Sequence, residues 1–161
     1  LYGQQLVLPE AVVDDSETAL LKGLDGRKMS KSYNNTIPLF EGEKKLKKAI
    51  NKIKTNLLEP GEAKDPNDST VFDIYRAFAN AEQTAEMHQK FLDVIAWGEA
   101  NKELFNLINE ELGEAREKYN TLMESPDEVE EILQAGAAKA RVRAQSIVTP
   151  LRESMGLVKF S

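Results

Sequence analysis

Helical periodicity in the C-terminal half of the chain narrows the possible folds most. From residue 69 almost to the end, apolar residues recur three and four positions apart with charged residues between them. This spacing predicts a succession of amphipathic helices. Because the connections between them are short, neighbouring helices are expected to run antiparallel. The sequence therefore predicts a mainly α-helical fold in which four helical segments form an antiparallel bundle.

Polar residues mark where these helices begin. Asp68 or Ser69 is expected to cap the first helix, since its side-chain oxygen can accept a hydrogen bond from a free N–H group. Ser125 is followed by Pro126 and Glu128, which predicts an N-cap, a proline at the first helical position and a capping box. The predicted helices of the bundle span residues 69–80, 82–96, 98–123 and 125–155.

Little β sequence precedes the helices. Residues 1–13 contain a short apolar run that predicts a strand or an extended edge segment, and residues 18–21 predict a second short strand. A strand needs partners, so these residues are expected to complete a sheet whose other strands lie upstream of Leu1. Since the chain begins with this leucine, we expect it to be part of a longer protein.

A basic segment flanked by glycines occupies residues 23–35, Gly-Leu-Asp-Gly-Arg-Lys-Met-Ser-Lys-Ser-Tyr-Asn-Asn. The glycines and asparagines let the backbone bend tightly, so that Arg27, Lys28 and Lys31 converge on a small volume. Backbone N–H groups and lysine ammonium groups suit a polyphosphate, whose charge moves during phosphoryl or nucleotidyl transfer. A solvated basic turn is the alternative interpretation of these residues alone.

The next segment, residues 43–55, predicts a helix with Leu46, Ile50 and Ile53 on its buried stripe and lysines around the rest. A solvated helix face is one interpretation of these lysines. The other is a source of long-range attraction for phosphate beside the basic segment.

The motif Lys28-Met29-Ser30-Lys31-Ser32 resembles the KMSKS signature of class I aminoacyl-tRNA synthetases, and its flanks resemble those of the tryptophanyl-tRNA synthetase family. Residues 64–66 (Lys-Asp-Pro) resemble a further element of that family. The family also has an element similar to residues 96–99 (Ala-Trp-Gly-Glu), where alanine replaces its glycine at 96. It has another similar to residues 134–141 (Gln-Ala-Gly-Ala-Ala-Lys-Ala-Arg), where alanine replaces its glutamate at 138. The resemblance covers essentially the whole chain, aligned with the C-terminal portion of the family.

The resemblance implies ATP-dependent activation of tryptophan to tryptophanyl-adenylate and transfer to the 3′ end of tRNA(Trp). It implies that Lys28 and Lys31 are the catalytic cations and that Mg²⁺ accompanies ATP, without protein metal ligands that we can identify. Met29 is expected to be a packing anchor beneath the loop. The implied ATP-binding residues are Gly26, Lys28, Met29, Ser30, Lys31 and Ser32.

The resemblance also divides the chain. Residues 1–42 correspond to the end of a Rossmann α/β catalytic domain with its KMSKS loop, 43–67 to a linking helix and loop, and 68–161 to a helical anticodon-binding domain. In the last predicted helix, Lys139, Arg141 and Arg143 are candidates for anticodon contacts. A solvated basic helix end is the alternative for each. The family further implies a cytoplasmic homodimer that does not act at a membrane.

Composition narrows the remaining function classes. The net charge of −6 argues against a protein that coats nucleic acid indiscriminately, although basic residues gather at 27–31, 44–54 and 139–143. The absence of cysteine excludes disulfides and thiolate metal sites and fits a reducing cytoplasm. No apolar run is long enough to span a bilayer. The single histidine, His88, lies in a predicted helix and is expected to be a packing or surface residue.

Two alternatives stay open at this stage. Class I enzymes pair the KMSKS loop with an upstream His-x-Gly-His-like motif, which this chain lacks, so we expect the chain alone to be inactive. A non-catalytic helical RNA-binding or interaction module is the alternative to an enzyme portion. Within the enzyme class, tyrosyl-tRNA synthetase is the alternative.

Overall fold

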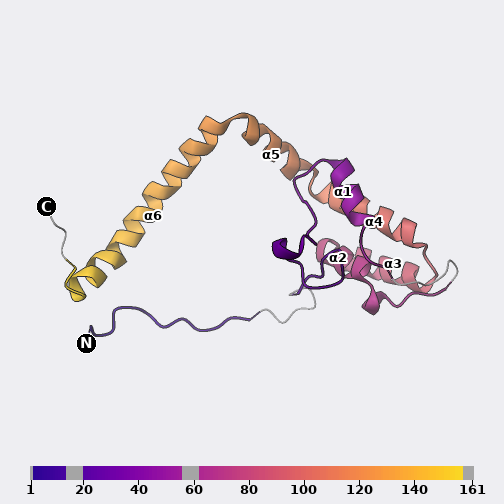
Figure 1. The fold of residues 1–161 in the computed structure, drawn as a ribbon, viewed down its shortest axis with the longest axis horizontal. Helices are drawn as coiled ribbons and strands as arrows, with labels where there is room; N and C mark the ends of the chain where they lie inside the picture. The colour runs from indigo at the N-terminus through magenta and orange to yellow at the C-terminus, as the bar shows by residue number, and fades with distance from the viewer. Residues whose placement is uncertain (1, 14–19, 56–61, 158–161) are drawn as a thin grey trace. The chain divides into compact units, whose positions relative to one another are not determined.

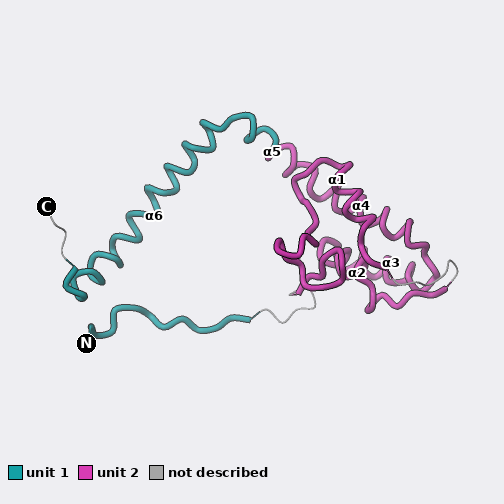
Figure 2. Tube along the Cα trace, viewed as in Figure 1, with its two compact units in different colours: residues 1–13, 120–161 teal, residues 14–119 magenta. Residues whose placement is uncertain are grey.

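The computed structural model describes residues 2–13, 20–55 and 62–157 (Figure 1). The chain forms two compact units, one of Leu1–Val13 with Asn120–Ser161 and the other of Asp14–Tyr119 (Figure 2). The described residues are mainly helical and contain no strand, so the predicted fold class is confirmed at this level. Their one isolated β-bridge pairs Lys22 with Lys28 in the antiparallel sense.

The described residues 2–13 form no strand, so of the two predictions for residues 1–13, a strand or an extended edge segment, the strand is not observed. Their apolar side chains are exposed, with Val7 at 91% and Val12 at 96% of full accessibility. Apolar residues favour an extended segment, but a strand forms only when a partner completes its hydrogen bonds. The second predicted strand falls partly on residues 18 and 19, outside the described residues, and residues 20 and 21 are not in a strand.

The larger unit is built around the helices α1 (Glu43–Ile50), α2 (Thr70–Phe78), α3 (Ala81–Leu92) and α4 (Trp97–Glu111). Helix α4 packs against α1 and α2, and α2 also packs against α3. Each helix presents an apolar stripe to this core, as the periodicity predicts. Core residues without solvent exposure include Leu46, Ile50, Ile74, Phe91, Leu104 and Ile108.

Local capping determines where the helices begin. The Ser69 hydroxyl accepts a hydrogen bond of 3.2 Å from the Phe72 N–H, so the cap predicted for α2 is confirmed. A capping box that was not predicted starts α3, where Asn80 and Gln83 exchange side-chain to backbone bonds of 2.9 Å. The capping box predicted at Ser125 is wrong, because its side chain makes no cap bond. Its backbone angles, φ −125° and ψ 64°, differ from the extended conformation of an N-cap.

Three predicted helices end clearly earlier than expected. The helix predicted over 82–96 is α3, which ends at Leu92. Helix α1 stops at Ile50 rather than continuing to residue 55. The helix predicted over 98–123 divides into α4 and α5 (Gly113–Glu124), because Leu112 leaves helical geometry with φ −97° and ψ 0°. Gly113 follows directly, and glycine is a weak helix former.

The smaller unit contains α6 (Pro126–Ser154), a helix of 29 residues with the predicted proline at its first position. None of its described residues is buried. The observed core is therefore the one that α1 to α4 form in the larger unit. The bundle of four antiparallel segments that includes the last helix stays a prediction.

Two short sequence elements noted above meet in the larger unit. Lys64, only 2% exposed, donates a hydrogen bond of 3.1 Å to the Glu62 carbonyl. Its ammonium lies 5.3 Å from the centre of the Trp97 ring at the start of α4. The buried ammonium thus fixes the segment before α2 against the start of α4 by a cation–π contact.

Candidate functional site

Residues 23–35, which we call the signature loop, form a tight hairpin followed by a short helical turn. The Met29 N–H donates to the Leu21 carbonyl at 3.0 Å, and the Gly23 N–H donates to the Arg27 carbonyl at 2.7 Å. The turn closes through a 2.9 Å bond from the Gly26 N–H to the Gly23 carbonyl. Gly26 has φ +80°, a left-handed conformation that favours glycine. The backbone of the motif is therefore set by the hairpin itself.

Asn35 holds the loop together from inside. Its side chain is buried, and its Oδ1 accepts a bond of 2.8 Å from the Ser30 N–H. Its Nδ2 donates to Asp25 Oδ1 at 2.7 Å and to the Lys28 carbonyl at 3.2 Å. Its own carbonyl accepts from the Leu24 N–H at 2.9 Å. One amide side chain thus links both arms of the hairpin, and buried amides that are fully bonded specify one conformation.

Gly23 makes room for this arrangement. A Cβ at this position would lie 2.5 Å from Cγ, Nδ2 and the carbonyl oxygen of Asn35. Real Cβ atoms essentially never lie this close to other heavy atoms, so any larger residue would displace the asparagine. Glycine is therefore needed at position 23 because Asn35 approaches its backbone closely, and not because the backbone has an unusual φ.

The cations of the loop differ in their surroundings. The Arg27 guanidinium forms an ion pair of 2.6 Å with Asp25 and lies 4.4 Å from the centre of the Tyr33 ring. Lys28 and Lys31 are exposed, and neither forms an ion pair with a carboxylate of the described residues. The loop therefore offers two ammonium groups to a ligand while its arginine is occupied internally.

Asp25 is part of this internal structure. The Asn35 hydrogen bond, followed by the bonds from Arg27, lowers the pKa of its carboxyl group from 3.8 to about 2, against a smaller opposing effect of burial. Hydrogen bonds to the charged form favour ionisation. Asp25 therefore remains a carboxylate across the physiological range and fixes Arg27 next to the turn.

The serines and methionine of the motif occupy distinct positions. The Ser30 and Ser32 hydroxyl oxygens are 2.8 Å apart, so one donates to the other. Ser32 belongs to the turn η1 (Lys31–Tyr33), which ends at Asn34 with a left-handed φ of 52°. Met29 is partly buried and packs against the hydrophobic core, as predicted for an anchor.

The loop is fastened to the helical core by two further contacts. The Lys22 ammonium forms an ion pair of 2.8 Å with the buried Asp73 of α2, which also pairs with Arg76 at 2.9 Å. On the other side, the Lys54 N–H donates to the Leu24 carbonyl at 2.7 Å. These contacts hold the base of the hairpin and leave Lys28 and Lys31 exposed.

The structure thus brings the predicted ATP-binding residues, 26 and 28–32, together in one hairpin and turn. Sequence reasoning missed Asn35, Asp25 and Asp73 as supporting residues. The adjacent asparagines at 34 and 35 were a signal for a turn, but nothing in the spacing shows that the second one points inward. His88 is half-buried, with its ring 5.8 Å from that of Phe72, which is a packing contact as predicted.

The candidate anticodon residues lie in the other unit, on α6. Lys139, Arg141 and Arg143 are all exposed, and Lys139 and Arg143 are one turn apart on the same side of the helix. No group of three His, Asp or Glu side chains suited to a metal ion occurs within the described ranges. Of the helices in the described part of the chain, none has the length and apolarity needed to cross a bilayer.

Comparison with known proteins gives consistent matches along the chain. The family model for "tRNA synthetases class I (W and Y)" matches residues 3–148. A tryptophan--tRNA ligase of Pseudomonas aeruginosa is 56% identical over 151 residues, which is 94% of this chain and 34% of the relative. The enzyme of the same name from Neisseria meningitidis is 51% identical over 97% of this chain and 46% of its own length.

A solved structure is also similar. The tryptophanyl-tRNA synthetase of Campylobacter jejuni, complexed with ADP and tryptophan, is 39% identical with a TM-score of 0.83. The match covers 97% of this chain and 49% of that structure. The chain therefore spans a third to a half of the length of the relatives that it matches.

Proposed function

Because the chain belongs to the class I tRNA synthetases of the W and Y group, we propose that it is a portion of an enzyme that joins tryptophan to its tRNA. The names of the relatives from Pseudomonas and Neisseria support tryptophan rather than tyrosine as the amino acid. The same names disfavour a non-catalytic RNA-binding module.

The reaction needs positive charge beside a leaving group. The tryptophan carboxylate attacks the α-phosphorus of ATP, the bond to the bridging oxygen breaks, and pyrophosphate leaves with the negative charge. Cations already in place at the leaving group lower the barrier without reorganising during the reaction. We assign this role to Lys28 and Lys31. The observation that carries the assignment is that both are exposed and free of ion pairs with the described residues, whereas Arg27 is held by Asp25.

The rest of the motif would bind or support ATP. The Ser30 and Ser32 hydroxyls are proposed to donate hydrogen bonds to phosphate oxygens, since each can leave the 2.8 Å bond that they share. Gly26 would let the loop close over the nucleotide, and Met29 would keep its base on the core. Magnesium is proposed to arrive with ATP, because Mg²⁺ is commonly held by substrate phosphates together with few protein ligands.

The division inferred from the sequence is part of the proposal. Residues 1–42 would end a Rossmann catalytic domain, 43–67 would link, and 68–161 would form an anticodon-binding bundle. The exposure of Lys139, Arg141 and Arg143 supports their candidacy for contacts with anticodon bases or phosphates. A homodimeric enzyme of the cytoplasm completes the proposal.

Pyrophosphate exchange by the full-length protein that contains this chain tests the proposal. We expect exchange between ATP and pyrophosphate that depends on tryptophan, and charging of tRNA(Trp). We expect neither from residues 1–161 alone, because the matching relatives are more than twice as long and the tryptophan pocket is proposed to lie in the remainder. Exchange that depends on tyrosine, or adenylate synthesis by the chain alone, would contradict the proposal.

A further inference from the structure

One face of helix α1 packs against the core, and the opposite face carries lysines. Leu46 and Ile50 have no solvent exposure, and α1 packs against α4. At the α4 contact, Asn109 donates a bond of 3.0 Å to Glu43, and the Lys47 ammonium lies 5.9 Å from the centre of the Phe105 ring. This packing fixes the rotation of α1, so the remaining lysines point away from the core.

Most of these outward lysines form no ion pair with a carboxylate in the described part of the chain. Lys45 forms an ion pair of 2.8 Å with Glu41. Lysines 44, 48, 52 and 54 are exposed, and none forms an ion pair with a described carboxylate. We call these four residues the α1 lysine surface. Although the chain has a net charge of −6, the ammonium groups of these four lysines repel one another locally. An anionic partner bound to them would offset this repulsion.

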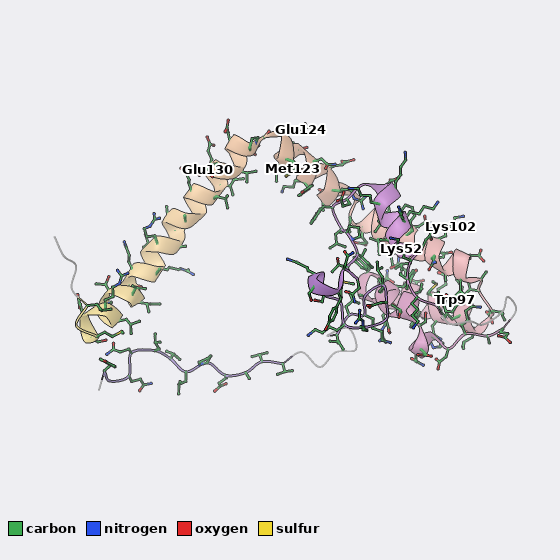
Figure 3. All side chains as sticks on the ribbon, viewed as in Figure 1. Lys52, Trp97, Lys102, Met123, Glu124 and Glu130 are labelled. Atoms are coloured by element: carbon green, nitrogen blue, oxygen red, sulfur yellow. The ribbon has the colours of Figure 1, made fainter. Side chains whose placement is uncertain are left out.

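Neighbouring α4 extends this positive region. Lys102 is exposed and precedes Phe105 by three residues and Asn109 by seven, so it is on the α4 face that contacts α1. Figure 3 marks Lys102 together with Lys52, which follows the end of α1. The positive region therefore includes residues from two packed helices.

The α1 lysine surface continues to the signature loop. Lys52 and Lys54 line a shallow hollow of about 330 Å³ together with Tyr33, Asn34 and Asn35 of that loop. The remaining lining residues are Leu24 and Asp25. Asp25 is the single carboxylate among these residues, and its charge is already bonded to Asn35 and Arg27. A polyanion in this hollow would therefore meet no uncompensated carboxylate among the lining residues.

We propose that the α1 lysine surface binds the sugar–phosphate backbone of the tRNA as its 3′ end approaches the signature loop. The inference rests on the proposed function, since aminoacylation requires the 3′ end to reach the site where the adenylate forms. Lys44 and Lys48 are four residues apart, about 6 Å along the helix axis, so the charges follow a line and suit a chain of phosphates better than one triphosphate. Lysine is a compact point charge, which binds phosphate without reading the base sequence.

The test is tRNA binding by the full-length protein as a function of salt, with Lys48→Gln, Lys52→Gln and the double variant. Each lost phosphate contact should reduce the slope of log K against log[salt] by about 0.7 to 0.9. At 0.15 M salt that corresponds to about a fourfold loss of affinity per lysine, and on the order of tenfold for the double variant. Cognate and non-cognate tRNA should lose affinity by the same factor.

Lys118→Gln is the matched control, because Lys118 is an exposed lysine of α5 outside this surface. It should leave the affinity and the salt slope unchanged. If the double variant binds tRNA with the wild-type affinity and slope, the surface proposal is wrong while the proposed function stands. If that variant instead slows tRNA-independent pyrophosphate exchange without weakening tRNA binding, the lysines act on ATP and the proposal is overturned. A wild-type protein that neither exchanges pyrophosphate nor binds tRNA would contradict the proposed function itself.

Discussion

Replacing Gly23 with alanine should loosen the signature loop without disturbing the helical core. The new Cβ would lie 2.5 Å from three atoms of Asn35, one of them its backbone carbonyl oxygen. Because Asn35 is 2% exposed and bonded on both sides, it cannot move aside without breaking bonds to Ser30 and Lys28. Overpacking of this kind costs about 1–3 kcal/mol, and loss of a buried hydrogen bond adds about 1 kcal/mol.

Amide hydrogen exchange is the assay for this change, because it reports opening of the loop residue by residue. A local cost of about 2–4 kcal/mol corresponds to exchange roughly 30- to 700-fold faster, since about 1.4 kcal/mol is a factor of ten. The reporters are the N–H groups of Leu24 and Ser30, which donate to Asn35.

The matched control is Gly136→Ala. Gly136 lies in the interior of α6, and apart from its chain neighbours and the helix's own backbone nothing would lie within 4 Å of its new Cβ. This substitution should stabilise the helix by about 0.5–1 kcal/mol and leave the loop amides unchanged. If the Leu24 and Ser30 amides of the Gly23→Ala protein exchange at the wild-type rate, the reasoning about close packing between Gly23 and Asn35 is refuted.

Other residues give predictions of the same kind. Hydrogen bonds lower the pKa of the Asp25 carboxyl from 3.8 to about 2, so the carboxylate should stabilise the loop fully above about pH 4 and lose this effect as the pH falls through 2. An NMR titration of Asp25 should show a midpoint near 2. A midpoint near 3.8 would contradict the hydrogen bonds. In urea denaturation, Ser69→Ala should reduce the free energy of unfolding by about 1 kcal/mol, because it removes the cap bond to Phe72. Ser125→Ala removes no cap bond and should reduce it less. Equal losses would refute the capping assignments. Arg143→Glu should weaken tRNA binding and lower its salt slope, and unchanged values would favour a solvated helix end.

The helices of the core could be predicted where local signals agree with burial. The Ser69 cap and the apolar stripe of α2 lie within a few residues of each other, and both were found from the sequence. The break at Leu112 was missed because apolar residues continue across it with helical spacing. The sequence signal was Gly113, a weak helix former that directly follows Leu112 with its φ of −97° and ψ of 0°.

The residues proposed to contact ATP were easier to predict from the sequence than the residues that hold the loop in place. The lysines and serines of the motif are adjacent in sequence, so their clustering follows from chain connectivity. Asn35 and Asp73 act through contacts with residues 5 and 51 positions away, Ser30 and Lys22 respectively. Such contacts depend on the path of the backbone, which is known only once the hairpin and α2 are placed.

Residues 1–13 were predicted as a strand or an extended edge segment, and the described residues 2–13 form no strand for a related reason. Val7 and Val12 have the residue type of a strand, but the described residues provide no neighbouring strand to complete the hydrogen bonds. Sequence pattern indicates which segments can pair, whereas pairing itself is a property of the surrounding structure.

Tryptophan-dependent pyrophosphate exchange by the Lys31→Ala form of the full-length protein tests the role of the loop most directly. If the exposed ammonium of Lys31 stabilises the leaving pyrophosphate, adenylate formation should slow on the order of 10²-fold. The Arg27→Ala protein is the comparison, because Arg27 is occupied by Asp25 and should affect the rate less. Exchange by the Lys31→Ala protein at a rate near that of the wild type would contradict the account.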